Sequence, residues 1–120
     1  NVQITDTFWK KEMELVRTEV IPYQWRALND EIEGAAPSFC MHNFEAAGRQ
    51  NKERREKGAE FKEPVYTFRG FETLPEDPGH LEDKFYGFVF QDSDFYKWIE
   101  AVGYSLSQHP DEKLEAIADD

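Results

Sequence analysis

The sequence has one cysteine, Cys40, and it contains no long apolar run. One cysteine cannot form an internal disulfide, which is typical of a reducing compartment. No stretch approaches the ~18 apolar residues that a membrane span needs. The first residues also do not show the pattern of a signal peptide, in which a positively charged segment precedes an apolar one. These absences exclude a disulfide-stapled or membrane-spanning fold, and they favour a cytoplasmic location.

Basic residues are also scarce, with 14 Lys and Arg against 25 Asp and Glu over 120 residues, so the formal charge is −11. Such an acidic surface repels phosphate, which excludes nucleic acid and anionic membranes as partners. The spacing of the glycines in the middle of the chain is not that of a phosphate-binding loop, so no nucleotide site is indicated; they are Gly48, Gly58, Gly70 and Gly87. The 18 aromatic residues (ten Phe, five Tyr, three Trp) indicate a folded domain and suit a neutral or cationic small ligand, including a sugar.

The first third of the chain predicts an extended arm followed by a kinked helix. Alternation at Val2 and Ile4 predicts an arm over residues 1–5. Asp6 then caps a helix over 6–33 whose apolar face includes Trp9, Met13, Val16 and Val20. Pro22 predicts a kink or restart within this helix, and Gly34 ends it.

The middle of the chain, residues 34–91, is predicted to be a long irregular loop with a charged insertion. Residues 35–48 suit an ordered loop or a broken helix, and 49–63 suit a solvated excursion that is helical or mobile. Alternation over 65–70 predicts a brief strand.

The last 29 residues, 92–120, predict a second helix and a truncated third one. Asp92 or Ser93 caps the second helix, which runs to Gln108, and Asp111 caps the third. These helices have apolar stripes with few partners in the chain, so we expect the chain to be the beginning of a larger protein. A small self-sufficient helical domain is the alternative.

The residues give no catalytic or metal site within the chain. Cys40 and His42 do not form a four-ligand zinc set, so packing roles are favoured for both. Asp92 and Asp94 resemble a glycosidase carboxylate pair, although capping a helix is the favoured role. Gln24 and Gln91 are uncharged amides among bulky apolar residues, so each needs a ligand hydroxyl or a backbone group as partner.

Four segments carry a resemblance to a known family: VQITDTFWKKEMELVRTEVIPYQW at the start, NDEIEG at 29–34, NFEAAG at 43–48, and GFVFQDSDFYKWIEAVGYSLSQHPDEKLE at 87–115. Together they resemble the N-terminal region of the β-L-arabinofuranosidases of glycoside hydrolase family 127. The resemblance covers the chain outside about 49–84. A neighbouring arabinofuranosidase family of similar architecture is left open.

The resemblance implies an all-α fold that is the N-terminal part of an (α/α)6 barrel, followed by β-sandwich domains. It implies a retaining exo-hydrolase of β-linked L-arabinofuranosides, with a cysteine nucleophile in a zinc-thiolate site and a glutamate acid/base. Those motifs lie outside these 120 residues. We therefore expect no cofactor in this chain, zinc in the full-length parent, and no activity from the isolated chain.

Substrate contacts are predicted near the barrel mouth, from Gln24, Gln91 and Asp92, with Tyr23 and Trp98 as shaping aromatics. Because missing helices would leave apolar faces bare, the isolated chain is expected to self-associate. The alternatives are a stand-alone carbohydrate-binding or protein-interaction module, and a purely structural helical protein.

Overall fold

The computed structural model describes residues 2–120, and helices are the only regular elements in that range. Their bounds are α1 Thr7–Leu15, the π-helical turn η1 Val16–Val20, α2 Ile21–Leu28, α3 Cys40–Lys57, the 3₁₀ turn η2 Gly58–Glu60, α4 Asp92–Gln108 and α5 Glu112–Asp119. The described residues hold no β-strand, and a single bridge joins Glu72 to Tyr86. The all-α prediction is confirmed.

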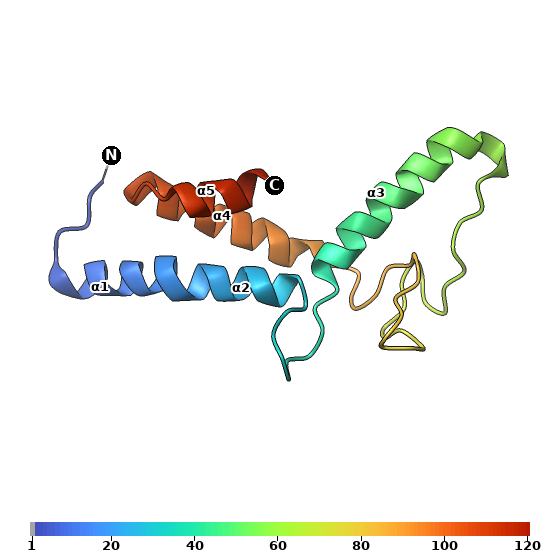
Figure 1. The fold of residues 1–120 in the computed structure, drawn as a ribbon, viewed down its shortest axis with the longest axis horizontal. Coiled ribbons are helices and arrows are strands. Elements are labelled where there is room, and N and C mark those ends of the chain that lie inside the picture. The colour runs from blue at the N-terminus through green and yellow to red at the C-terminus, as the bar shows by residue number, and fades with distance from the viewer. Residues whose placement is uncertain (1) are drawn as a thin grey trace.

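The first helical unit runs without a break from α1 through η1 into α2 (Figure 1). Asp6 caps it as predicted, since its Oδ1 accepts a 2.9 Å hydrogen bond from the Trp9 N–H. Pro22 has no N–H to donate, and the helix accommodates it with the preceding π-helical turn, in which the Ile21 N–H donates to the Val16 carbonyl. The predicted restart at Pro22 is confirmed in that α2 begins at Ile21, with the π-helical turn directly before it.

The same unit ends at Leu28, five residues before the predicted end at residue 33. The Asn29 side chain donates to the Trp25 carbonyl at 2.9 Å, and Asp30 has a left-handed backbone with φ of 60°. The Asn29 side chain occupies a carbonyl of the last turn, and Asp30 tolerates the left-handed region. The helix therefore ends here and not at Gly34.

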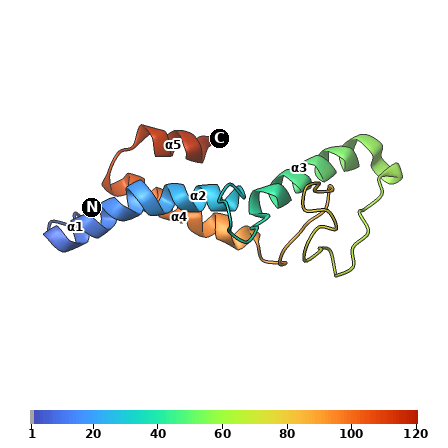
Figure 2. The ribbon, with the colours of Figure 1, turned by 60° about the horizontal axis from the view of Figure 1, so that its bottom comes forward.

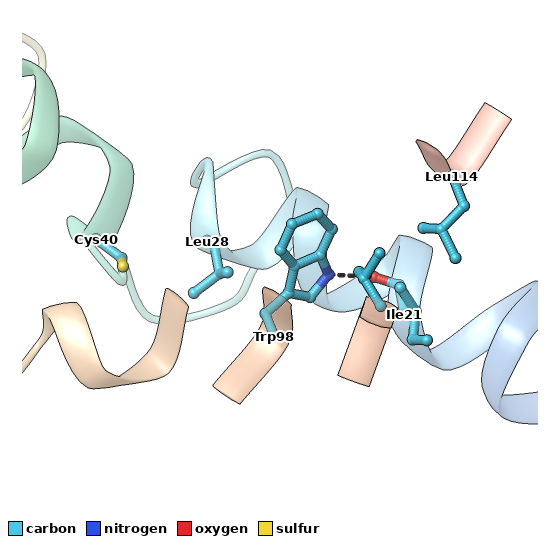
Figure 3. Packing of buried hydrophobic residues seen from close by; sticks show 6 residues of the cluster. Ile21, Leu28, Cys40, Trp98 and Leu114 are labelled. Atoms are coloured by element: carbon cyan, nitrogen blue, oxygen red, sulfur yellow. Dashed lines mark hydrogen bonds between the residues drawn. The ribbon is translucent and has the colours of Figure 1, made fainter. Parts of the chain in front are cut away.

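Helix α4 runs back alongside α2, and α5 packs on α4 (Figures 1 and 2). The core between them contains Trp98, which is 2% exposed. Its ring stacks on Trp25 with centroids 4.5 Å apart, and its Nε1–H donates to the Ile21 carbonyl at 3.0 Å (Figure 3). The other buried members of this cluster are Ile21, Leu28, Cys40, Val102 and Leu114.

Within the segment 34–91, predicted to be mainly an irregular loop, Cys40–Lys57 form one continuous helix, α3, so the ordered-loop prediction is wrong over Cys40–Gly48. This helix buries small and polar side chains, Ala46 and Gln50 among them, because its partner is largely extended backbone. The helical alternative for the charged segment is confirmed as far as Lys57. The predicted strand at 65–70 is wrong, since these residues have no strand geometry and the Glu72 side chain binds the Thr67 N–H where a strand would need a ladder.

The two C-terminal helices differ in how they begin. Helix α4 begins at Asp92, and its N-cap residue is Gln91, so the prediction that Asp92 or Ser93 caps it is wrong. Asp92 and Asp94 instead lie in its first turn, where negative charge is favoured by the helix dipole. Asp111 does cap α5, since its Oδ1 accepts from the backbone N–H groups of Lys113 and Leu114.

The chain is more extended than an isolated domain of its length. Its radius of gyration is 18.1 Å, against about 14 Å for a compact 120-residue domain. Five apolar side chains of α1 and η1 are 38–61% exposed, namely Phe8, Trp9, Leu15, Val16 and Val20. A groove of about 760 Å³ lies between α1 and the C-terminal half of α4. Much of the apolar face predicted for the first helix is therefore uncovered.

Asp111 also joins α5 to the first helical unit, because its Oδ2 accepts a 2.7 Å hydrogen bond from Arg17 Nη1. Arg17 in turn pairs with Glu14. The hydrogen bond from the Leu114 N–H, together with Arg17, lowers the pKa of Asp111 below its usual range. A depressed carboxyl pKa contributes stability that is present above the unfolded pKa and is lost as pH falls through the folded one.

We therefore expect the docking of α5 to weaken in acid, below the ordinary Asp range, and Asp111→Asn to remove part of this pH dependence. Thermal melting of both proteins between neutral and acid pH measures the effect. Asp119→Asn, at the far end of α5, is the matched control. Identical pH profiles for Asp111→Asn and the parent chain would contradict the assignment.

Candidate functional site

A cavity of about 340 Å³ opens where α3 meets the first turn of α4. Segments at 70–71 and 85–89 complete its wall. Its lining residues are Cys40, Asn43, Phe44, Ala47, Gly70, Phe71, Phe85, Phe88, Val89, Gln91, Asp92 and Tyr96. Two of the five predicted substrate-binding residues, Gln91 and Asp92, are in this set.

Polar side chains of α3 hold the segment that forms one side of the cavity. The Asn43 amide donates to the Tyr86 carbonyl at 2.8 Å and accepts from the Tyr86 N–H at 2.9 Å. His42 Nε2 lies 2.9 Å from the Lys84 carbonyl, and Gln50 Nε2 donates to the Asp83 carbonyl at 2.9 Å. These bonds satisfy backbone groups that the single bridge to Glu72 leaves unpaired, and they fix the position of the wall.

The side-chain amide of Gln91 joins two backbone segments by hydrogen bonds. Its Nε2 donates to the Ser38 carbonyl, and its Oε1 accepts a 3.2 Å hydrogen bond from the Phe88 N–H. Gly87 sits against this amide with φ of +90°, and a Cβ added there would lie 3.1 Å from Gln91 Oε1. Of the two partners predicted for this amide, the structure shows the backbone one.

Asp92 is the exposed carboxylate of the cavity. Its negative charge raises the pKa of Tyr96, one helical turn further along α4. The ion pairs found among residues 2–120 do not include Asp92, whereas Asp94 pairs with Lys97 at 3.6 Å. Asp92 is therefore placed to meet a ligand.

The three other predicted residues lie elsewhere. Tyr23 is 53% exposed and Gln24 is also exposed, both on α2 outside the cavity. Trp98 is in the core, where its ring and its N–H are both used for packing. The five predicted residues thus occupy an open helix face, a cavity and the hydrophobic core.

Cys40 is a buried residue of the core whose thiol is hydrogen-bonded. It is 0% exposed, its thiol donates to the Gln91 carbonyl at 3.3 Å, and burial raises the pKa of the thiol. A raised pKa disfavours the reactive thiolate. Within the described part of the chain, no cluster of three or more His, Cys, Asp and Glu side chains could hold a metal ion. The packing interpretation of Cys40 is therefore supported, and the described residues do not fit a zinc site.

Sequence reasoning missed Asn43, Phe44 and Tyr96 as members of a site. The sequence did contain a sign of a helix here, because the helical spacing of three and four residues is followed by Asn43, Ala46, Ala47 and Gln50. This helical face is hard to recognise because two of its four residues are polar.

The described residues form a helical unit with an aromatic-lined cavity, and comparison with known proteins identifies its family. Residues 1–120 match the model of the β-L-arabinofuranosidase GH127 catalytic domain. The chain belongs to this family.

Two relatives support the assignment. A non-reducing end β-L-arabinofuranosidase of Bifidobacterium longum subsp. longum is 38% identical over 119 residues, covering 99% of this chain and 15% of the relative. The crystal structure of a GH127 β-L-arabinofuranosidase from Geobacillus stearothermophilus T6 is 41% identical, with a TM-score of 0.63, over 99% of this chain and 14% of that one. The chain thus spans about a seventh of the length of these relatives.

None of the helices formed by residues 2–120 combines the length and apolar content needed to cross a membrane.

Proposed function

We propose that this chain is the N-terminal part of a retaining, exo-acting β-L-arabinofuranosidase that hydrolyses β-linked L-arabinofuranosides. In this proposal it supplies the first helices of an (α/α)6 barrel. The observation that carries the proposal is the match of the whole chain to the GH127 catalytic domain and to two relatives about seven times its length. A cytoplasmic location of the enzyme is part of the proposal, and its support is the single cysteine and the sequence pattern at the start of the given chain.

The isolated chain is proposed to be inactive. The thiol of its one cysteine is buried and engaged, and its described residues form no metal-binding cluster. The nucleophile, the acid/base and the zinc of the parent enzyme are therefore proposed to lie in the rest of that protein. The extended shape and the uncovered apolar face of α1 agree with a segment whose packing partners are encoded elsewhere.

This segment is proposed to contribute substrate contacts at the mouth of the barrel. Because Trp98 is level with Ile21 and α4 runs antiparallel to α2, the start of α4 lies near the end of α2. Asp92 lies at this end of the helix pair, whereas Gln24 and Tyr23, in the first half of α2, remain proposed contacts through their exposed side chains. Gln91 and Trp98 are proposed to act by positioning their neighbours.

Hydrolysis of a β-L-arabinofuranoside by the purified 120-residue chain, compared with a longer chain that includes the downstream cysteines, tests the proposal. We expect turnover and one bound zinc only in the longer chain. Turnover by the 120-residue chain would overturn the proposed inactivity, and a longer chain without turnover would overturn the proposed activity.

A stand-alone carbohydrate-binding module is the second candidate, because the aromatic cavity is already formed in this chain. Calorimetry against arabinose-containing oligosaccharides discriminates the two. Well-defined binding by a monomeric, cooperatively melting 120-residue chain would favour the module.

A further inference from the structure

The cavity beside α3 has walls that are mainly aromatic. Five of its lining residues carry rings: Phe44, Phe71, Phe85, Phe88 and Tyr96. Phe44 and Tyr96 meet edge to face with centroids 6.2 Å apart, and Phe44 is supported from behind by Phe95 at 5.2 Å. Such walls offer π faces and apolar contact to a ligand. The volume of about 340 Å³ is at the lower end of the range for small-molecule sites.

Most of the polar groups in the cavity are already used. The Asn43 amide is bonded to Tyr86, the Gln91 amide to Ser38 and Phe88, and the Cys40 thiol to the Gln91 carbonyl. The Asp92 carboxylate, which is exposed and interacts with the Tyr96 hydroxyl one turn along α4, is the charged group that the lining side chains offer to a ligand. The cavity therefore combines aromatic faces with one carboxylate.

The electrostatic potential at this position favours positive charge. The carboxylate of Asp92 raises the pKa of Tyr96, and carboxylates at Asp94, Asp92 and Asp30 add to the main effect of burial in raising the pKa of Cys40. The chain as a whole carries −11. The positive end of the α4 dipole, equivalent to about half a charge, opposes this field but is smaller than the two carboxylates of the first turn.

A sugar ring suits this set of groups less well than a cation does. A pentose presents several hydroxyls, and each one that is buried without a partner weakens binding. An ammonium or guanidinium group on a short apolar stem needs only a carboxylate and aromatic faces.

We propose that the cavity binds an organic cation, with the charged group beside Asp92 and its apolar stem between Phe44 and Phe88. The ligand is either a free alkylamine or the side chain of a Lys or Arg in a peptide, since both present the same chemistry. This inference does not rest on the proposed hydrolase activity, which has its own assay.

Chemical-shift titrations of the 120-residue chain with n-butylammonium and with Nα-acetyl-lysine methylamide test the proposal, and n-butanol serves as the neutral probe. We expect saturable shifts at Phe44, Phe88 and Tyr96 with the cations and none with n-butanol. Tighter binding of n-butylammonium indicates a free amine as the ligand, and tighter binding of the lysine derivative indicates a peptide.

Asp92→Asn should weaken cation binding by roughly tenfold or more, because the charge is lost at constant shape. The matched control is Asp94→Asn, in the same turn but paired with Lys97 outside the cavity, and it should leave binding within about twofold. Phe88→Ala removes one ring from a residue that is 59% exposed, so the fold is retained while binding weakens. Circular dichroism of each variant verifies folding.

Three results would overturn the proposal. Equal weakening by Asp92→Asn and Asp94→Asn would indicate non-specific attraction to an acidic surface. Saturable shifts at the same rings with L-arabinose but not with the cations would make the cavity a sugar subsite. Absence of binding in the longer chain would show that other parts of the protein fill the cavity.

Discussion

Trp98→Ala is expected to lower the free energy of unfolding by roughly 3–5 kcal/mol, the usual cost of removing a large aromatic from a core. Trp98 is 2% exposed, stacks on Trp25 and donates to the Ile21 carbonyl, so one side chain joins α4 to α2 by both packing and hydrogen bonding. Since domains of this size are stable by only about 5–15 kcal/mol, the variant should lose much of its cooperative unfolding transition.

Urea unfolding followed by circular dichroism measures this effect, and Trp98→Phe separates its two sources. The phenyl ring retains most of the packing but leaves the Ile21 carbonyl without its indole partner, for an expected loss of about 1–3 kcal/mol. Tyr104→Ala, at a position on α4 that is 68% exposed, is the control and should change stability by no more than about 0.5 kcal/mol. A Trp98→Ala protein as stable as the Tyr104→Ala protein would contradict the assignment of the core.

The second large expected effect is self-association of the isolated chain. Two polar substitutions should remove it. Trp9 and Val16 are 56% and 41% exposed, and both line the groove between α1 and α4. An apolar groove of this size, if left open to water, favours contact with another molecule. Trp9→Ser combined with Val16→Ser should therefore shift the chain from oligomers toward monomers in light scattering.

Val65→Ser is the matched control for this experiment. Val65 is 83% exposed but lies in the loop after η2, away from the groove. Its substitution should leave the oligomers unchanged. A parent chain that is a monodisperse monomer, with little binding of an apolar dye, would count against an uncovered interface on α1.

Local chemistry was predictable from the sequence where one residue acts on its own neighbours. Asp6 and Asp111 cap their helices as predicted, because a capping side chain needs only the backbone two or three residues ahead. The limits of the first helix were not predictable in the same way. Pro22 is absorbed by a π-helical turn, and Asn29 with Asp30 ends the helix before Gly34 is reached.

Helix α3 was predicted only in part, as one alternative for each half, because its buried face does not follow the apolar rule. Asn43 and Gln50 donate hydrogen bonds from their side-chain amides to extended backbone, so the buried face of the helix is polar in sequence.

The prediction of substrate-binding residues placed Gln91 and Asp92 together in the cavity, but it did not separate their roles. Sequence proximity placed Gln91 beside Asp92, but it could not show that the Gln91 amide is held by Ser38 and Phe88 while the Asp92 carboxylate is open to solvent.

Reconstitution of the enzyme from two separate pieces tests the central claim most directly. The 120-residue chain and the remainder of the longer protein are purified apart and assayed for hydrolysis of a β-L-arabinofuranoside, singly and mixed at equal concentration. If the helices α1, α2 and α4 are integral walls of the catalytic domain, neither piece alone is active and the mixture is. A remainder that hydrolyses the substrate as fast alone as in the mixture would contradict the account.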